Sequence, residues 1–220
     1  MTSHEHTHAI PDGPVDPAEH RAHWEERYSG ESPWSGKPNP PMVDEVTGLP
    51  GADRTALDLG CGAGADTVWL AEQGWQTTGA DIAEAALQHA AQAVDAAGVT
   101  DRVELVRTDL DSWEPERTWD LVVANFLHSQ LVPDRNPLLE RALRWVAPGG
   151  SLLLLSHLRH PSWREAPQHF AMPSLQDVVD FATRPGWIVV TAKETETDLP
   201  SPEGEPGIRV DTLVRVVRDK

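Results

Sequence analysis

The sequence is short of basic residues, of cysteine and of long apolar runs, and each shortage excludes a class of protein. Its 220 residues hold 18 Lys and Arg against 35 Asp and Glu, a formal net charge of −17. Such a charge repels nucleic acids and anionic membranes, so we expect neither as a partner. The single cysteine, Cys61, excludes a disulfide framework and favours a reducing compartment. Without an apolar run of about 18 residues or a visible signal peptide, the expected location is the cytoplasm.

The length is that of one domain, which we expect to be a monomer or a homodimer. Residues 1–16 contain His4, His6 and His8 but almost nothing apolar to bury, which predicts a disordered tail. Alternating histidines on such a tail would bind a metal only loosely, so we predict no metal site. The remaining residues divide into an N-terminal segment, 17–50, and a core, 51–220.

The core is organised around a glycine-rich stretch, Thr55 to Asp66. A short apolar run is followed by three alternating glycines and then by a helix-like run that stops at Gly74. Strand, glycine turn and helix open a nucleotide-binding α/β unit, because glycine lets a ligand approach the backbone closely. The spacing also fits the dinucleotide pattern G-x-G-x-x-A, through Gly60, Gly62 and Ala65.

The charge around the loop argues against a dinucleotide. No Lys or Arg occurs between Thr55 and Thr100, whereas three acids surround the glycines: Asp58, Asp66 and Asp81. A pyrophosphate would meet no cation there, while a ligand with a sulfonium and an ammonium would be attracted. Asp81 ends a second strand-like run, where an acid accepts both hydroxyls of a ribose. The competing interpretation is a merely solvated acidic rim.

Five motifs, in order, resemble those of the class I S-adenosylmethionine-dependent methyltransferases. They are Leu57 to Gly64, Gly79 to Ile82, Arg107 to Leu110, Trp119 to Asn125 and Ala147 to Leu152. The resemblance implies that residues 17–220 form a methyltransferase domain with S-adenosyl-L-methionine as cofactor and a small molecule as methyl acceptor. It implies a cofactor site built from Asp58, Gly60, Cys61, Gly62, Ala63, Gly64, Asp66, Asp81, Ile82, Asp109, Leu110, Asn125 and Phe126. Asp109 would accept a hydrogen bond from the adenine amino group, between Ile82 and Leu110; otherwise it caps the following turn.

Three aromatic residues mark the N-terminal segment. Trp24 and Tyr28 fall on one face of a helix that starts at Asp16–Pro17, and Trp34 is in an irregular loop. Their spacing resembles the thiopurine, halide/thiol and tellurite-resistance branch, where such residues line the donor and acceptor pocket. This implies a lid over the sulfonium, held by cation–π attraction; the alternative is a plug for one end of the core. The nearby Asn39-Pro40-Pro41-Met42 resembles a motif of DNA amino-methyltransferases, but no apolar strand precedes it and the net charge opposes DNA.

The remaining apolar pattern predicts a doubly wound, Rossmann-like α/β fold with a seven-stranded sheet, mostly parallel with an antiparallel C-terminal strand, plus a short N-terminal aromatic cap. Further strands are expected at 103–107, 121–124, 151–156, 187–192 and 208–217. Helices are expected at 83–97, 137–146 and 175–182.

His128 and His157 follow neighbouring strands and are the candidate catalytic residues. A neutral histidine would remove the proton of an oxygen or nitrogen acceptor, whereas a thiol or another soft anion would need no base. Residues 161–173 are expected to help shape the acceptor pocket. Two other interpretations stay open: a non-catalytic S-adenosylmethionine-binding protein and an NAD-dependent oxidoreductase.

Overall fold

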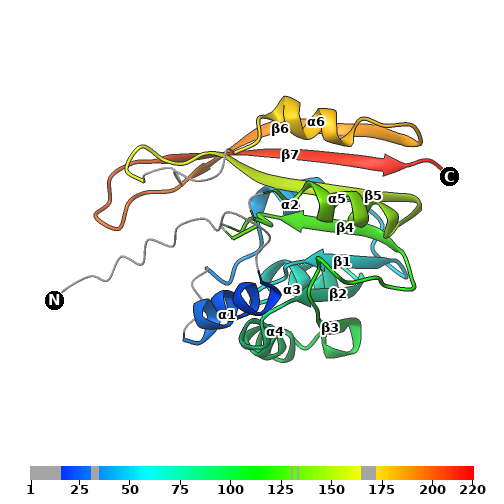
Figure 1. Ribbon diagram of the computed structural model, residues 1–220, viewed down its shortest axis with the longest axis horizontal. Helices are drawn as coiled ribbons and strands as arrows, with labels where there is room; N and C mark the ends of the chain where they lie inside the picture. The colour runs from blue at the N-terminus through cyan, green and yellow to red at the C-terminus, as the bar shows by residue number, and fades with distance from the viewer. Residues whose placement is uncertain (1–15, 31–34, 130, 133, 165–171) are drawn as a thin grey trace.

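A seven-stranded sheet forms the centre of the molecule, with strand order β3-β2-β1-β4-β5-β7-β6 (Figure 1). The computed structural model describes residues 16–30, 35–129, 131–132, 134–164 and 172–220. Strands β1 to β5 are parallel, and β7 pairs antiparallel with both β5 and β6. The strands are β1 (Thr55–Leu59), β2 (Gln76–Asp81), β3 (Val103–Arg107), β4 (Trp119–Asn125), β5 (Val146–Arg159), β6 (Trp187–Asp198) and β7 (Ile208–Arg218).

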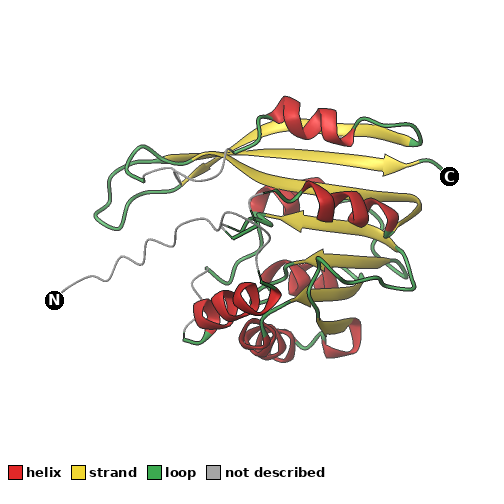
Figure 2. Ribbon diagram, viewed as in Figure 1, coloured by secondary structure: helices red, strands yellow, loops and turns green. Residues whose placement is uncertain are grey.

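Helices cover both faces of the sheet (Figure 2). On one face, alternate side chains of the strands pack with α5 and α6, and on the other they pack with α2 and α3. Helix α4 lies against β3 and α3, and α1 lies against α4. The helices are α1 (Pro17–Tyr28), α2 (Pro40–Val46), α3 (Ala65–Glu72), α4 (Glu84–Ala97), α5 (Asn136–Arg144) and α6 (Leu175–Ala182), with a 3₁₀ turn at Thr100–Arg102.

The strand order reverses beside β1. The chain moves outward from β1 to β2 and β3, and then returns to place β4 on the other side of β1. In open α/β sheets, ligands bind outside the carboxyl ends of the strands at such a switch point. The glycine loop after β1 and the residues after β4 therefore face the same crevice.

The predicted Rossmann-like fold with an antiparallel C-terminal pair is confirmed, but several boundaries differ. Helix α5 ends at Arg144 rather than 146, because the backbone N–H of Trp119 donates to the Trp145 carbonyl and β5 begins at once. Strand β5 therefore spans Val146–Arg159 rather than 151–156. Strand β6 runs on to Asp198, paired with β7 except for a register shift between Val189 and Thr191. The N-terminal segment also contains α2, which the sequence pattern does not predict and whose two leading prolines suit the first turn of a helix.

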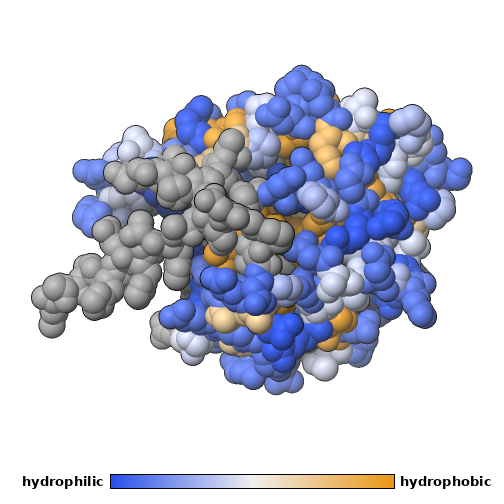
Figure 3. Space-filling model, in the orientation of Figure 1, coloured by the Kyte–Doolittle hydropathy of each residue, from blue (hydrophilic) through white to orange (hydrophobic). Residues whose placement is uncertain are grey.

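The surface matches the composition. The face in Figure 3 is predominantly hydrophilic, with scattered apolar patches. No helix within the described ranges combines the length and the apolar character needed to span a bilayer.

Candidate active site

The glycine loop connects β1 to α3 and is fastened to the end of β2. The backbone N–H groups of Gly60 and Cys61 both donate to the carbonyl of Ala80, at 2.8 and 3.0 Å. Gly62 has φ +53°, and a Cβ added there would lie 2.5 Å from the hydroxyl oxygen of Tyr28. A side chain at position 62 would therefore be strained and would push α1 away from the loop.

Asp81 holds the loop from the end of β2. Its Oδ2 accepts the N–H of Gly62 at 2.8 Å, and its Oδ1 accepts the N–H of Ala83 at 2.9 Å. Burial raises the pKa of this carboxyl, and the backbone hydrogen bonds oppose that rise. Since a carboxylate has about four acceptor positions, Asp81 can still accept two hydroxyl protons.

Two further acids lie beneath the loop. Asp58 accepts the hydroxyl of Thr67 at 2.7 Å, and burial, reinforced by the neighbouring Asp66, raises its pKa to about 8. Asp66 is bound by two amide side chains: Asn39 Nδ2 at 2.7 Å and Asn125 Nδ2 at 2.8 Å. Such an acid-rich pocket is suited to a cationic ligand.

Asn125, at the end of β4 beside Asp66, has one side-chain oxygen that accepts no hydrogen bond. Its Nδ2 is engaged by Asp66, but its Oδ1 is buried without a hydrogen-bond partner. A buried carbonyl without a donor is costly, so this oxygen fits a ligand that brings an N–H, such as an amino acid ammonium. The acids and this oxygen together fit S-adenosylmethionine.

Sequence reasoning gave Asn39 no role in the site. Its backbone N–H donates to Asp66 Oδ1 at 2.7 Å while its side chain reaches Oδ2, so it anchors the start of α2 to the first turn of α3. The Asn-Pro-Pro segment therefore has a structural use: Asn to bind the acid, and two prolines to start the helix.

The N-terminal helix covers one side of the loop. Tyr28 is buried among Ala83 and Ala86 of the core, with Ala63 and Trp24 packed alongside. The rings of Trp24 and Tyr28 are 6.4 Å apart. Trp34 lies outside the described residues, so its place in a lid stays a prediction.

Glu25, which the sequence did not single out, attaches α1 to the body. Its carboxylate accepts the backbone N–H groups of Glu84 and Ala85, at 2.8 and 3.0 Å, and forms an ion pair with Arg107 at 3.1 Å. Helix α4 has no side-chain cap of its own, so an acid from another helix supplies it.

The end of β3 brings the predicted adenine-side residues next to Asp81. The N–H of Thr108 donates to the carbonyl of Asp81 at 2.9 Å, and Leu110 is buried. Asp109 accepts the N–H of Asp111 at 3.0 Å, so it does cap its own turn. Contact of Asp109, Leu110 and Ile82 with an adenine ring stays a prediction.

The two candidate histidines converge beyond β4 and β5. Their ring centroids are 5.6 Å apart, and the backbone N–H of His157 donates to Nε2 of His128 at 3.4 Å. Nδ1 of His157 lies 2.9 Å from Oδ1 of Asp211, a fully buried carboxylate on β7. This carboxylate favours the tautomer with the proton on Nδ1, which leaves Nε2 of His157 as a base.

His128 is not suited to the same task. Burial, and then the positive charge of Arg135, lower its pKa to about 3. It therefore stays neutral at working pH, and its Nε2 is already an acceptor for the backbone of His157. Of the two histidines, His157 is the better candidate base.

Phe126 belongs to this histidine group as well. Its ring stacks on His157 with centroids 4.2 Å apart, and the guanidinium of Arg209 lies 4.9 Å from its centroid. Its φ of +50° is unusual for a bulky residue and costs about 1–3 kcal/mol. Such strain is typical of functional sites, and here it orients the ring at the carboxyl end of β4.

Three polar residues of this region were missed from the sequence: Arg135, Arg209 and Asp211. Asp211 did carry a signal, since it is the single acid of its strand and lies next to Val210 in the segment expected to be buried. Arg209 donates from Nε to its Oδ2 at 2.8 Å. Arg135 lies just before α5, where the sequence pattern offers no hint of its burial.

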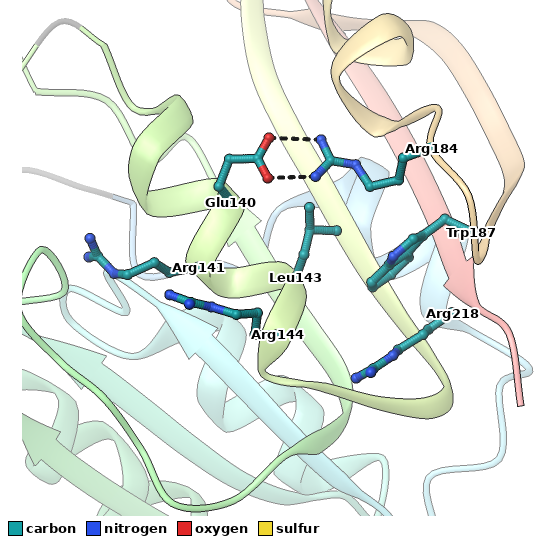
Figure 4. A pocket seen from close by; sticks show the side chains of 7 residues that line it. All are labelled: Glu140, Arg141, Leu143, Arg144, Arg184, Trp187 and Arg218. Carbon is teal, nitrogen blue, oxygen red and sulfur yellow. Dashed lines mark hydrogen bonds and ion pairs between the residues drawn. The ribbon is translucent and has the colours of Figure 1, made fainter.

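A separate cleft of about 450 Å³ opens between helix α5, the end of α6 and the paired strands β6 and β7 (Figure 4). Arg218, at the end of β7, donates to the carbonyl of Val146 at 2.7 Å, which places the cleft at the amino edge of the parallel strands. Arg184 forms a bidentate ion pair with Glu140 at 2.6 and 2.9 Å. These arginines tie α5 and α6 to the sheet, on the edge opposite the glycine loop.

Comparison with known proteins finds methyltransferases. A family model described as a methyltransferase domain matches residues 56–150. The trans-aconitate 2-methyltransferase of Streptomyces coelicolor is 31% identical over 165 residues, which are 74% of this chain and 50% of that protein. A probable thiol methyltransferase 2 of Arabidopsis thaliana is 29% identical over 137 residues, 60% of each chain.

Among solved structures, the N-methyltransferase NodS of Bradyrhizobium japonicum, in complex with S-adenosyl-L-homocysteine, shares the fold. Its TM-score is 0.65 with 21% identity, and the match covers 91% of this chain and 98% of that one. The chain spans 38–60% of the length of the first curated relatives it matches.

Proposed function

Because the chain belongs to the class I S-adenosylmethionine-dependent methyltransferases, we propose that it transfers the methyl group of S-adenosylmethionine to a small nucleophilic molecule. The observation that carries the proposal is the acid-lined loop without a cation. Asp81 accepts the Gly62 N–H there, and Asp58 and Asp66 lie below it. A sulfonium and an ammonium are the charges that such a pocket attracts.

The residues around the glycine loop each have a role in this proposal. Asp81 accepts the ribose hydroxyls, the unpaired Oδ1 of Asn125 accepts an ammonium proton, and Tyr28 with Trp24 closes the side of the sulfonium. The sulfonium itself supplies most of the activation. The residues therefore contribute mainly by holding the methyl group and the acceptor in line, a large effect in bimolecular chemistry.

Two classes of acceptor remain in competition. A thiol or another soft anion would react without a base, and the aromatic segment around Trp24 and Tyr28 favours a closed pocket for it. The His157–Asp211 hydrogen bond of 2.9 Å favours instead an oxygen or nitrogen acceptor whose proton His157 removes. The names of the curated relatives include trans-aconitate on one side and thiol or thiocyanate on the other. A carboxylate such as trans-aconitate is already ionised at neutral pH, so these names do not decide whether His157 acts as a base.

The test is calorimetric binding followed by turnover. We expect micromolar binding of S-adenosylmethionine and of its demethylated product, and no comparable binding of NAD. Release of S-adenosylhomocysteine would then be followed with trans-aconitate, thiocyanate, hydrosulfide, small thiols and phenols. Tight NAD binding without a response to S-adenosylmethionine would contradict the family-based function. Cofactor binding without turnover of any acceptor would favour a non-catalytic binding protein.

A further inference from the structure

Arg135 carries a charge that no described carboxylate balances. Its Nη2 donates to the hydroxyl of Ser156 at 2.5 Å, while its Nη1 is buried without a hydrogen-bond partner. Within the described residues no acid forms an ion pair with it, and burial alone lowers its pKa, to about 10. A buried cation in this state costs free energy, so it demands a reason.

The acids of this region already have partners. Asp134, exposed and next to Arg135 in the chain, accepts the N–H of Asn136 at 3.0 Å. Asp211 binds His157 with one oxygen and Arg209 with the other, at 2.9 and 2.8 Å. Neither carboxylate forms an ion pair with Arg135.

Arg135 stands on the acceptor side of the crevice. Ser156, to which it donates, directly precedes His157 on β5. Its charge also depresses the pKa of His128, the residue that accepts the His157 backbone N–H. A group bound by Arg135 would therefore lie beside the candidate base and apart from the acidic glycine loop.

We propose that Arg135 binds a carboxylate of the methyl acceptor, so that the acceptor is a small organic anion. The inference rests on the proposed function and names its substrate class. A guanidinium fork matches the two oxygens of a carboxylate.

The first test uses stability, which needs no known substrate. Because the charge is unbalanced in the free protein, Arg135→Met should raise the melting temperature by about 2 °C or more. The matched control is Arg184→Met, which removes a guanidinium that Glu140 does bind and should lower the melting temperature. Acetate at the same ionic strength as chloride should stabilise the wild type and leave Arg135→Met unaffected.

The second test uses acceptor pairs that share a nucleophile and differ in charge: 3-mercaptopropionate against 3-mercaptopropionamide, and 4-hydroxybenzoate against 4-hydroxybenzamide. The wild type should favour the carboxylate by about 30-fold or more in kcat/KM. Arg135→Met should abolish this preference, mainly through KM, and Arg135→Lys should keep part of it.

Three results would overturn the inference: a lower melting temperature for Arg135→Met, an acetate effect that is equal in both proteins, or a carboxylate preference that survives the substitution. If S-adenosylmethionine binds but no acceptor of either pair is methylated, the proposed methyl transfer to such acceptors is at fault. The melting and acetate measurements still decide the role of Arg135 in that case.

Discussion

The glycine-loop half of the crevice buries carboxyl groups, whereas the histidine half holds partly buried guanidinium groups. On the first side, Asp58, Asp66 and Asp81 lie in a stretch without Lys or Arg from residue 55 to 100. On the second, Arg135 and Arg209 outnumber Asp211. Each arrangement is costly in the protein without a ligand. Burial raises the pKa of Asp58 and Asp81 on the first side and lowers the pKa of Arg135 on the second. If both proposals hold, the two halves of the crevice select their ligands by charge before shape.

The largest expected effect separates the two histidines. With an acceptor that arrives protonated, such as a phenol, His157→Ala should reduce kcat/KM by about a hundredfold or more, because the Asp211-oriented base is lost. His128→Ala should cost less than about tenfold, since a histidine with a pKa of about 3 takes no proton. The measurement is turnover against pH for both variants. Equal losses of kcat/KM in the two variants would contradict the different roles given to the two histidines. Thiol turnover that is unchanged in both variants would favour the soft-anion acceptor.

The next effect concerns the acid half. Asp81→Ala should lose roughly 2–3 kcal/mol of cofactor affinity, because charge-assisted bonds to the ribose are removed. Asp120→Ala is the control: it also removes a carboxylate that accepts a backbone N–H, from Thr55 at 2.9 Å, but at the amino end of β4. Calorimetry should find its affinity unchanged. If Asp81→Ala folds and binds the cofactor with unchanged affinity, Asp81 does not bind the ribose.

A smaller effect concerns the attachment of α1. Glu25→Gln weakens a two-bond cap on α4 and removes the ion pair with Arg107, so it should cost about 1 kcal/mol in stability. The cofactor affinity should fall a few-fold as well, because α1 carries Tyr28 onto Gly62. Glu19→Gln, in the first turn of the same helix, is the control and should change neither quantity. Chemical denaturation and calorimetry give both numbers. If Glu25→Gln is destabilised but binds the cofactor normally, the attachment of α1 does not contribute to cofactor binding.

The last effect is the release of a fraction of a proton when the cofactor binds. Since the pKa of Asp58 is raised from 3.8 to about 8, the free protein holds a proton at neutral pH that the unfolded chain has lost. Stability should therefore fall as pH rises between these values, and Asp58→Asn should flatten that slope. A cationic cofactor favours the carboxylate, so binding near pH 7 should release a proton. Calorimetry in buffers of different ionisation heat measures this release, and proton uptake on binding would contradict it.

The sequence could predict the acid half far better than the basic half. Asp58 and Asp81 stand next to glycines and at strand ends, where local pattern and function coincide. Arg135 comes near this region through its hydrogen bond to Ser156 on β5, and Arg209 through the pairing of β7 with β5. Both are long-range contacts that no local pattern encodes. Asp211 lies between these cases, because the single acid of a strand with buried valines is visible in the sequence. Helix α2 is hard to predict, because adjacent prolines are as typical of a loop as of the first turn of a helix.

The antiparallel direction of β7 has an evolutionary consequence. Because β7 runs toward the amino edge, its first residues, Arg209 and Asp211, lie at the carboxyl edge beside His157. Under the proposed function, the residues that hold the methyl donor come mainly from the chain up to Asn125, and those that meet the acceptor come from the chain after it. The two sets are then encoded largely in succession. A chimera joined directly after β4 should exchange the acceptor while inheriting the donor site.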